Sequence, residues 1–198
     1  MTPFRLGLTG SIGMGKTTTA GFFSAAGLPV WSADDAVHRL YARGGAAVVP
    51  LGAAFPAALR DGMIDRAALR FAIAADAASL IRIESIVHPL AAADRAEFIA
   101  GTNADIVVLD IPLLFETGTE AEMDATLLVT APSSVQRERV LARAGMTETL
   151  FQSLLARQMP DPEKRRRATH IIETLGLEAA RHGVLALIAH IRKSRENA

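Results

Sequence analysis

The sequence begins with a short apolar stretch that leads into the glycine-rich run Gly10-Ser-Ile-Gly-Met-Gly-Lys-Thr17. This run satisfies the pattern G-x-x-x-x-G-K-[ST], between a predicted strand and a predicted helix, which is the context that the pattern requires. Glycines let the backbone curl so that successive N–H groups point at an anion, and the helix N-terminus adds partial positive charge. The run therefore predicts a loop that holds the phosphates of a nucleotide, in preference to a purely structural glycine-rich turn.

Two side chains of this loop have specific predicted roles. Lys16 supplies the charge that reaches the outer phosphates, and Thr17 offers a hydroxyl to Mg²⁺. Only three of the 21 basic residues are lysines, so composition alone would favour arginine at position 16. The residues predicted to contact ATP in this loop are Gly10, Ser11, Gly13, Met14, Gly15, Lys16, Thr17 and Thr18.

Short β-branched runs alternate with longer helical patterns along the chain, which indicates an α/β fold with a parallel sheet covered by helices. The last helical pattern carries an apolar stripe that is typical of a helix packed on a core. The predicted strands are Arg5–Thr9, Pro29–Ser32, Ile106–Ile111, Ala125–Thr130 and His170–Glu173.

More than seventy residues separate the second predicted strand from the third. Such an interval exceeds what one crossover between parallel strands needs, and long insertions are usually functional. We therefore expect an inserted helical subdomain. Its predicted helices are Asp34–Arg43, a stretch around Ala46–Phe55, Arg66–Asp76 and Ala78–Ala100.

Composition excludes several classes of protein. The 198 residues are 50% hydrophobic, which suits one domain with a substantial core. A net charge of zero gives no global signal for nucleic acid or a membrane surface as partner. The absence of cysteine excludes a disulfide framework and thiolate metal sites. We expect a cytoplasmic protein, and we favour a monomer, although no motif reports on oligomeric state.

Charge is distributed unevenly along the chain. Residues 105–131 contain six acids and no base, whereas residues 132–167 contain eight bases against four acids. The basic segment predicts a mobile, arginine-bearing lid that meets polyphosphate. Solvated helix faces are the alternative for individual arginines.

Acidic residues follow the second and third predicted strands. A carboxylate at the end of the strand beside the phosphate loop lies where α/β sheets bind ligands, so Asp34 or Asp35 can accept a proton or orient Mg²⁺. The alternative is a helix N-cap, and we expect capping from one aspartate and chemistry from the other. Asp110 ends the third strand in a Walker B-like pattern, although a strand-end aspartate is also an ordinary turn residue. The apolar run Leu113–Phe115 predicts either an acceptor-binding ledge or a tucked core segment.

The guanine-reading motif N-K-x-D is missing, because the only asparagines, Asn103 and Asn197, are not followed by lysine. This excludes a GTPase of the Ras type and favours ATP. The chain is also too short for the large motor ATPases.

In their order and spacing, the motifs resemble the dephospho-coenzyme A kinase family nearly end to end. The resemblance rests on GLTGSIGMGKTT, SAD with AVHRLY, DGMIDRAALR, IVHPL, IPLLFE and ARQMPDPEKRRRATHII. It implies a three-layer P-loop fold of the nucleoside-monophosphate-kinase type, with a five-stranded parallel core sheet, a helical acceptor-binding insertion and a lid. It also implies ATP-dependent phosphorylation of the ribose 3′-hydroxyl of dephospho-coenzyme A, the last step of coenzyme A biosynthesis.

The resemblance assigns roles by position. Asp34 matches the proposed catalytic base, with Lys16 and Arg143 as further catalytic residues. Arg139 and Arg143 match lid arginines that contact the nucleotide. His88 falls where the acceptor binds, although a histidine before a proline can instead shape a helix junction. The residues expected to contact the acceptor are Asp34, His88, Leu113, Leu114 and Glu116.

Three positions depart from the family pattern. Ser32 replaces the first acid of a D-x-D motif, so one carboxylate of that pair survives. Glu173-Thr174-Leu175-Gly176 replaces D-N-x-G on the adenine side, and Asp110 stands where the family tolerates apolar residues. The alternatives are another small-metabolite or nucleotide kinase of the same fold, and a nucleotide-binding module that performs no transfer.

These predictions divide one kinase domain, residues 1–198, into three functional regions. The core comprises 1–33, 104–131 and 168–198, the acceptor-binding insertion comprises 34–103, and the lid comprises 132–167.

Overall fold

The computed structural model describes residues 2–197. Two compact units make up this range: one is formed by residues 2–30 and 103–197, and the other by residues 31–102. The second unit has limits close to those of the predicted insertion. None of the helices within residues 2–197 combines the length and the apolar character that crossing a lipid bilayer requires.

A five-stranded sheet with the order β2-β5-β1-β6-β7 organises the first unit, and the border between the units falls within β2. β1 runs parallel to β5 and to β6, and β6 runs parallel to β7. This confirms the predicted α/β fold with its parallel sheet. The strands are β1 (Phe4–Thr9), β2 (Val30–Ser32), β5 (Ile106–Asp110), β6 (Ala125–Thr130) and β7 (His170–Glu173).

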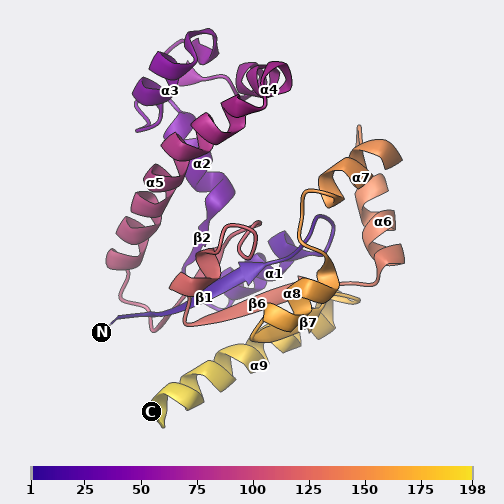
Figure 1. Ribbon diagram of the computed structural model, residues 1–198. Coiled ribbons are helices and arrows are strands. Elements are labelled where there is room, and N and C mark those ends of the chain that lie inside the picture. The colour runs from indigo at the N-terminus through magenta and orange to yellow at the C-terminus, as the bar shows by residue number, and fades with distance from the viewer. Residues whose placement is uncertain (1, 198) are drawn as a thin grey trace. The chain divides into compact units, whose positions relative to one another are not determined.

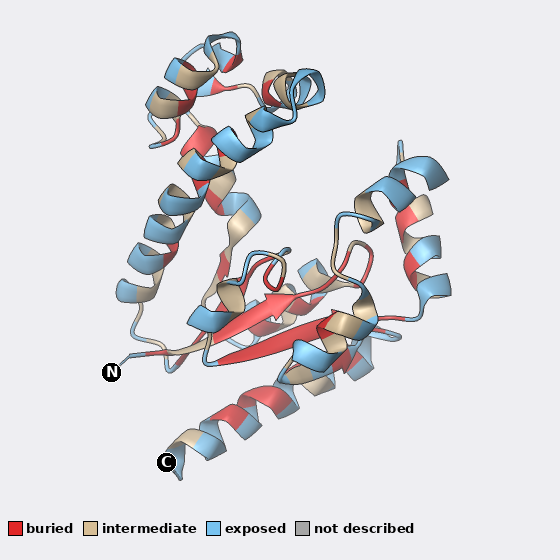
Figure 2. Ribbon diagram, in the orientation of Figure 1, coloured by how far each residue is buried: buried red, intermediate tan, exposed pale blue. Residues whose placement is uncertain are grey.

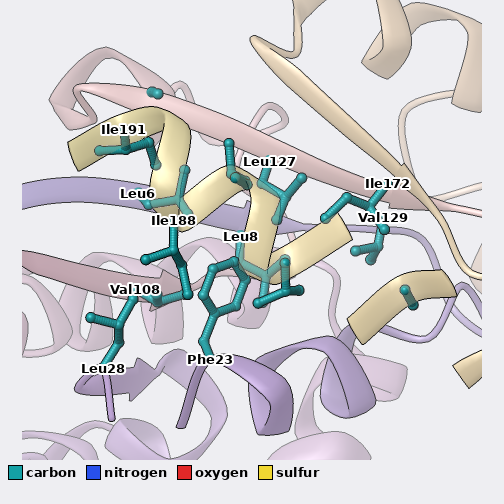
Figure 3. Close-up of a cluster of buried hydrophobic side chains, with 14 of the residues drawn as sticks. Leu6, Leu8, Phe23, Leu28, Val108, Leu127, Val129, Ile172, Ile188 and Ile191 are labelled. Atoms are coloured by element: carbon teal, nitrogen blue, oxygen red, sulfur yellow. The ribbon is translucent and has the colours of Figure 1, made fainter. Parts of the chain in front are cut away.

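One face of this sheet is covered by α1 (Lys16–Ala25) and α9 (Leu177–Glu196), which pack on each other and on the strands (Figure 1). Figure 3 shows the ring of Phe23 from α1 directed toward Leu8 and Ile188 in this core. β6 is buried along its whole length, whereas α9 alternates between buried and exposed positions (Figure 2). The buried stripe of α9 is the one that the sequence pattern predicts: Ala180, Val184, Leu187, Ile188 and Ile191.

Three helices form the basic segment: α6 (Ser133–Leu141), α7 (Glu148–Leu155) and α8 (Asp161–Arg167). The sequence pattern predicts a helix over Thr147–Met159 and then a break, but α7 ends earlier and α8 begins inside the expected break. Prolines at the start of a helix are well tolerated, because the first N–H groups have no partner within the helix. The prolines of the break therefore open a helix instead of preventing one.

The second unit is helical, with a small core of its own that contains Leu40, Leu51 and Val87. α5 matches the predicted helix Ala78–Ala100 and continues through Pro89, so the alternative of a helix junction at His88 and Pro89 does not hold. The helices are α2 (Ala33–Tyr41), α3 (Val48–Ala54), η1 (Pro56–Ala58), α4 (Arg66–Ala75) and α5 (Ala78–Ala100), with η2 (Thr119–Glu122) in the first unit.

A two-stranded hairpin in the second unit, β3 (Leu59–Arg60) and β4 (Met63–Ile64), was not predicted. Asp61 and Gly62 form its turn with φ of 50° and 75°. Positive φ at both central residues is what a type I′ turn requires, and Asp-Gly is one of its favoured pairs. The dipeptide was therefore a readable signal in the sequence.

Asp94 on α5 links α5 to Arg39 of α2 and to Trp31 of β2. Its Oδ1 accepts hydrogen bonds from Trp31 Nε1 at 2.7 Å and from Arg39 Nη2 at 2.5 Å. The Arg39 hydrogen bond, together with that of Trp31, lowers the pKa of Asp94 below its ordinary value, against the opposing effect of burial. The carboxylate thus serves as an internal tie within residues 31–102.

Candidate active site

The glycine-rich run forms a curled loop between β1 and α1. Gly13 and Gly15 adopt φ of 79° and 89°, a region that favours glycine. A Cβ at Gly13 would lie 2.5 Å from Val140 Cγ2, and one at Gly15 would lie 3.0 Å from Thr174 Oγ1. Backbone conformation and close packing therefore both require glycine here, and α1 begins directly after Gly15.

Lys16 and Thr17 occupy the first turn of α1. The Lys16 ammonium forms an ion pair with Asp110 at the end of β5, and the Asp110 side chain is 9% exposed. Thr17 and Thr18 are exposed. The loop thus presents a charged lysine, held by a strand-end carboxylate, beside free hydroxyl groups at a helix N-terminus. This is an arrangement suited to a polyphosphate.

Thr174, in the segment that departs from the family pattern, closes the back of the loop. Its hydroxyl donates to Met14 O at 2.8 Å and accepts from Arg139 Nη1 at 3.0 Å. Arg139 Nη2 also donates to Thr174 O. Arg139 of α6 is therefore bonded to the segment after β7. Although this segment lacks the family's D-N-x-G pattern, Thr174 still bonds it to the phosphate loop.

A cavity of about 280 Å³ lies against this loop. Arg143, just after α6, lines it with an exposed side chain, and nothing within residues 2–197 bonds its guanidinium. Arg139 lines the same cavity but is already held by Thr174. Arg143 is thus the arginine of this cavity that can turn toward an anion. The lining residues are Gly13, Gly15, Thr18, Thr19, Arg139, Arg143, Thr174, Leu175, Gly176, Leu177 and Ala180.

The segment after β5 combines buried and exposed apolar residues. Leu114 and Phe115 are 0% and 2% exposed, and Leu114 Cδ2 would touch a Cβ placed at Gly7. The core alternative therefore holds for Leu114, whose predicted contact with an acceptor does not fit this burial. Leu113 is 41% exposed and keeps a free face.

Glu116 is held by the segment that follows α7. Its Oε1 accepts the Met159 N–H at 2.8 Å and lies 2.9 Å from Lys164 Nζ. Lys164 is 0% exposed. The carboxylate predicted to face an acceptor is thus engaged on one oxygen with the protein itself, which points to a role in shaping the loop.

The remaining predicted residues belong to the second unit. Ser32 caps α2, because its hydroxyl accepts the Asp35 N–H at 3.2 Å. The expectation that one aspartate caps this helix is therefore wrong, since the serine in the first-acid position does so. Asp34 and His88 have exposed side chains, and neither side chain forms a hydrogen bond or an ion pair with the described residues.

Comparison with known proteins settles the family. A family model for dephospho-CoA kinase matches residues 4–177. The chain belongs to the dephospho-CoA kinase family. A dephospho-CoA kinase from Cereibacter sphaeroides is 66% identical over 196 residues, covering 99% of this chain and 100% of the relative. A dephospho-CoA kinase from Jannaschia sp. is 58% identical over 189 residues, covering 95% and 97%.

Solved structures agree with this fold. The crystal structure of TT1252 from Thermus thermophilus aligns with a TM-score of 0.86 at 35% identity, over 96% of this chain and 98% of that one. A dephospho-CoA kinase from Campylobacter jejuni aligns with a TM-score of 0.66 at 20% identity, over 96% and 98%. Shikimate kinase from Acinetobacter baumannii, with a TM-score of 0.52 at 18% identity over 98% and 95%, shares the fold alone.

Four residues that support this candidate site had no predicted role: Gln136, Gln158, Lys164 and Thr174. Gln158 and Gln136 bond the N–H and the carbonyl of Ile12 in the phosphate loop, Lys164 pairs with Glu116, and Thr174 bonds Met14. Gln136 and Gln158 carry no pattern that distinguishes them from surface glutamines. Lys164 offered a weak signal, because lysine is rare in this chain, but the sequence grouped it with the other bases of the predicted lid, for which solvated helix faces are the alternative.

Proposed function

We propose that this member of the dephospho-CoA kinase family transfers the γ-phosphoryl group of ATP to the ribose 3′-hydroxyl of dephospho-coenzyme A, giving coenzyme A and ADP. The observation that carries the proposal is the phosphate loop with Lys16, joined through Met14 and Thr174 to the cavity that Arg143 lines. Family membership over nearly the whole chain supports the choice of acceptor.

On the nucleotide side, the loop N–H groups and the start of α1 hold the phosphates, and Lys16 neutralises charge on the outer ones. Lys16 must turn from Asp110 toward the nucleotide, so the ion pair keeps the lysine in place until ATP binds. Arg143 meets the charge that develops on the transferred group, because its guanidinium faces the cavity with no other partner within residues 2–197.

The residues present fit a magnesium ion. Mg²⁺ in kinases usually takes one or two protein ligands and completes its shell with phosphate oxygens and water. Thr17 supplies a hydroxyl, and the Asp110 carboxylate lies against the neighbouring Lys16. No cluster of three or more metal-binding side chains exists among the described residues, and such a site does not need one. The ion would neutralise negative charge on the phosphates.

On the acceptor side, we assign to Asp34 the acceptance of the 3′-hydroxyl proton as the oxygen attacks phosphorus. An exposed carboxylate with no competing partner in the described range is available for this role. Ser32 in place of the first acid removes one negative charge and supplies a helix cap instead, so the proposal uses a single carboxylate. His88 and Leu113, both exposed, are the further proposed acceptor contacts, while Glu116 shapes the loop beside Leu113.

ADP release, coupled to an optical assay, tests this proposal with a panel of acceptors. Dephospho-coenzyme A should give turnover at least about 10²-fold above shikimate, gluconate, AMP or water, because a site that hydrogen-bonds its substrate rejects an acceptor that leaves its polar groups unpaired. Turnover with another acceptor would favour a different metabolite kinase. ATP binding with no turnover on any acceptor would favour a non-catalytic module.

A further inference from the structure

Ile12 in the phosphate loop has both of its peptide groups held by glutamines from the basic segment. Its N–H donates to Gln158 Oε1 at 3.1 Å, and its carbonyl accepts from Gln136 Nε2 at 2.8 Å. Gln136 is 4% exposed. Phosphate loops turn their N–H groups toward the anion, but the Ile12 N–H is bonded to the segment that follows α7.

The next residue along this segment holds the loop after β5. The Met159 N–H donates to Glu116 Oε1 at 2.8 Å, and Lys164 Nζ lies 2.9 Å from the same oxygen. We call residues 158–164 the strap. Two consecutive strap residues thus bond two different loops, one on the nucleotide side and one beside the proposed acceptor contact Leu113.

Lys164 anchors the strap at an energetic cost. An ammonium group buried to 0% exposure loses its hydration, and a buried ion pair often contributes little net stability. Lys164 Nζ has no further hydrogen-bond acceptor, and Glu116 Oε2 is buried without a donor, within the described chain. Because well-packed apolar residues are often at least as stabilising as a buried ion pair, the charge pair points to a role in orientation.

We infer that the strap couples the two substrate sites: occupation of the phosphate loop fixes Ile12, and through Gln158 and Met159 this orients Glu116 and the loop that carries Leu113. Gln158 and Lys164 are then positioning residues, which act through other groups and touch neither substrate. The inference rests on the proposed function, because it places ATP in the phosphate loop and the acceptor beside Leu113.

Binding cooperativity measures this coupling. The Kd of dephospho-coenzyme A is determined by calorimetry with and without a non-hydrolysable ATP analogue. The wild-type ratio should be on the order of tenfold, within the usual range for coupled sites. Gln158→Leu should bring the ratio to within about twofold of one while leaving the acceptor Kd without nucleotide unchanged.

Two variants separate positioning from structure. Gln158→Glu keeps an oxygen that accepts the Ile12 N–H and should retain the wild-type ratio. Gln152→Leu removes an exposed glutamine whose amide bonds Glu148 one turn earlier, and it should also retain that ratio. If Gln158→Leu does not fold, Gln158→Asn takes its place, because its shorter side chain withdraws the oxygen from Ile12.

Lys164→Met tests the other end of the strap. It should raise the KM for dephospho-coenzyme A about tenfold with a smaller change in kcat, because the loop after β5 loses its orientation. Arg166→Met is the matched control on the same helix, since Arg166 is exposed and pairs with Glu163.

A wild-type ratio of one, or a folded Gln158→Leu protein with the full wild-type ratio, would overturn the strap inference alone. Failure of the wild type to bind the ATP analogue or to phosphorylate dephospho-coenzyme A would overturn the proposed function and the strap with it. The titrations and the ADP-release assay of the wild type together distinguish the two failures.

Discussion

The phosphate loop and the second unit, residues 31–102, differ in how many hydrogen bonds and ion pairs hold their candidate residues. Lys16 is paired with Asp110, and Thr174 is bonded to Met14 and Arg139. In contrast, Asp34 and His88 stand on exposed helix surfaces, without a hydrogen bond or ion pair to any described side chain. The nucleotide side is a bonded framework built before ligand arrives, whereas the insertion presents single groups. Substitutions in the framework should therefore disturb binding as well as chemistry, and those at Asp34 should affect chemistry alone.

Lys16→Ala should have the largest effect. It removes the charge that meets the outer phosphates, and we expect kcat/KM to fall by about 10³ to 10⁵, as for other cationic groups in phosphoryl transfer. Coupled ADP release measures this loss. Lys193→Ala on α9, an exposed lysine, is the control and should keep wild-type turnover. Near-normal turnover of Lys16→Ala would refute the assignment of the phosphate loop.

Asp34→Asn should slow chemistry by about 10² to 10⁴, the span of a general-base contribution, while ATP still binds. Asp35→Asn is the matched control, because the Asp35 carboxylate lies in the same turn of α2 as Asp34. The Asp35→Asn substitution should be tolerated. Measurement combines kcat with calorimetric ATP binding. An inactive Asp35→Asn beside an active Asp34→Asn would move the base by one residue, and two active variants would remove the carboxylate from the mechanism.

Arg143→Ala should lower kcat by about 10²-fold with a smaller effect on ATP affinity, because its guanidinium meets charge in the transition state. Arg137→Ala, which removes an exposed arginine of α6 paired with Glu148, provides the comparison and should leave both parameters unchanged. Weakened ATP binding with normal kcat would assign Arg143 to ground-state binding instead.

Asp94→Asn should have the smallest effect and should act on stability. The Arg39 hydrogen bond holds the pKa of Asp94 below the ordinary 3.8, so the carboxylate stabilises the fold above that pH, and this contribution disappears as pH falls through the lowered pKa. Since Arg39 is about half exposed, we expect a loss of about 1 kcal/mol or less near pH 7, vanishing in strong acid. Urea titrations between pH 7 and pH 2 measure it. An equal deficit at both pH values would show that charge is not involved.

The sequence predicted features whose physical cause is local. The glycines of the phosphate loop and the period of α9 both follow from short-range backbone and packing rules, and both are confirmed. Features that depend on distant partners were missed. The sequence alone does not indicate that Ile12 meets Gln158, or that Lys164 lies buried against Glu116, because these pairs are more than forty residues apart in the chain.

The N-cap of α2 is a case in which a local signal in the sequence was overlooked. Ser32 stands where the family has an acid, yet serine is a favoured N-cap residue and performs that role. The prediction assigned the cap to an aspartate, whereas the N-cap preference of serine was a local signal that it did not use. The site residues in the insertion remain predictions, since their roles depend on a bound acceptor.

The most direct test of the central claim locates the transferred phosphate. The wild-type protein is incubated with ATP and dephospho-coenzyme A, and the product is analysed by phosphorus NMR and mass spectrometry. We predict one new phosphomonoester on the ribose 3′-oxygen for each ADP formed. ADP formed without a new phosphomonoester, or a phosphate on any other oxygen, would contradict the account.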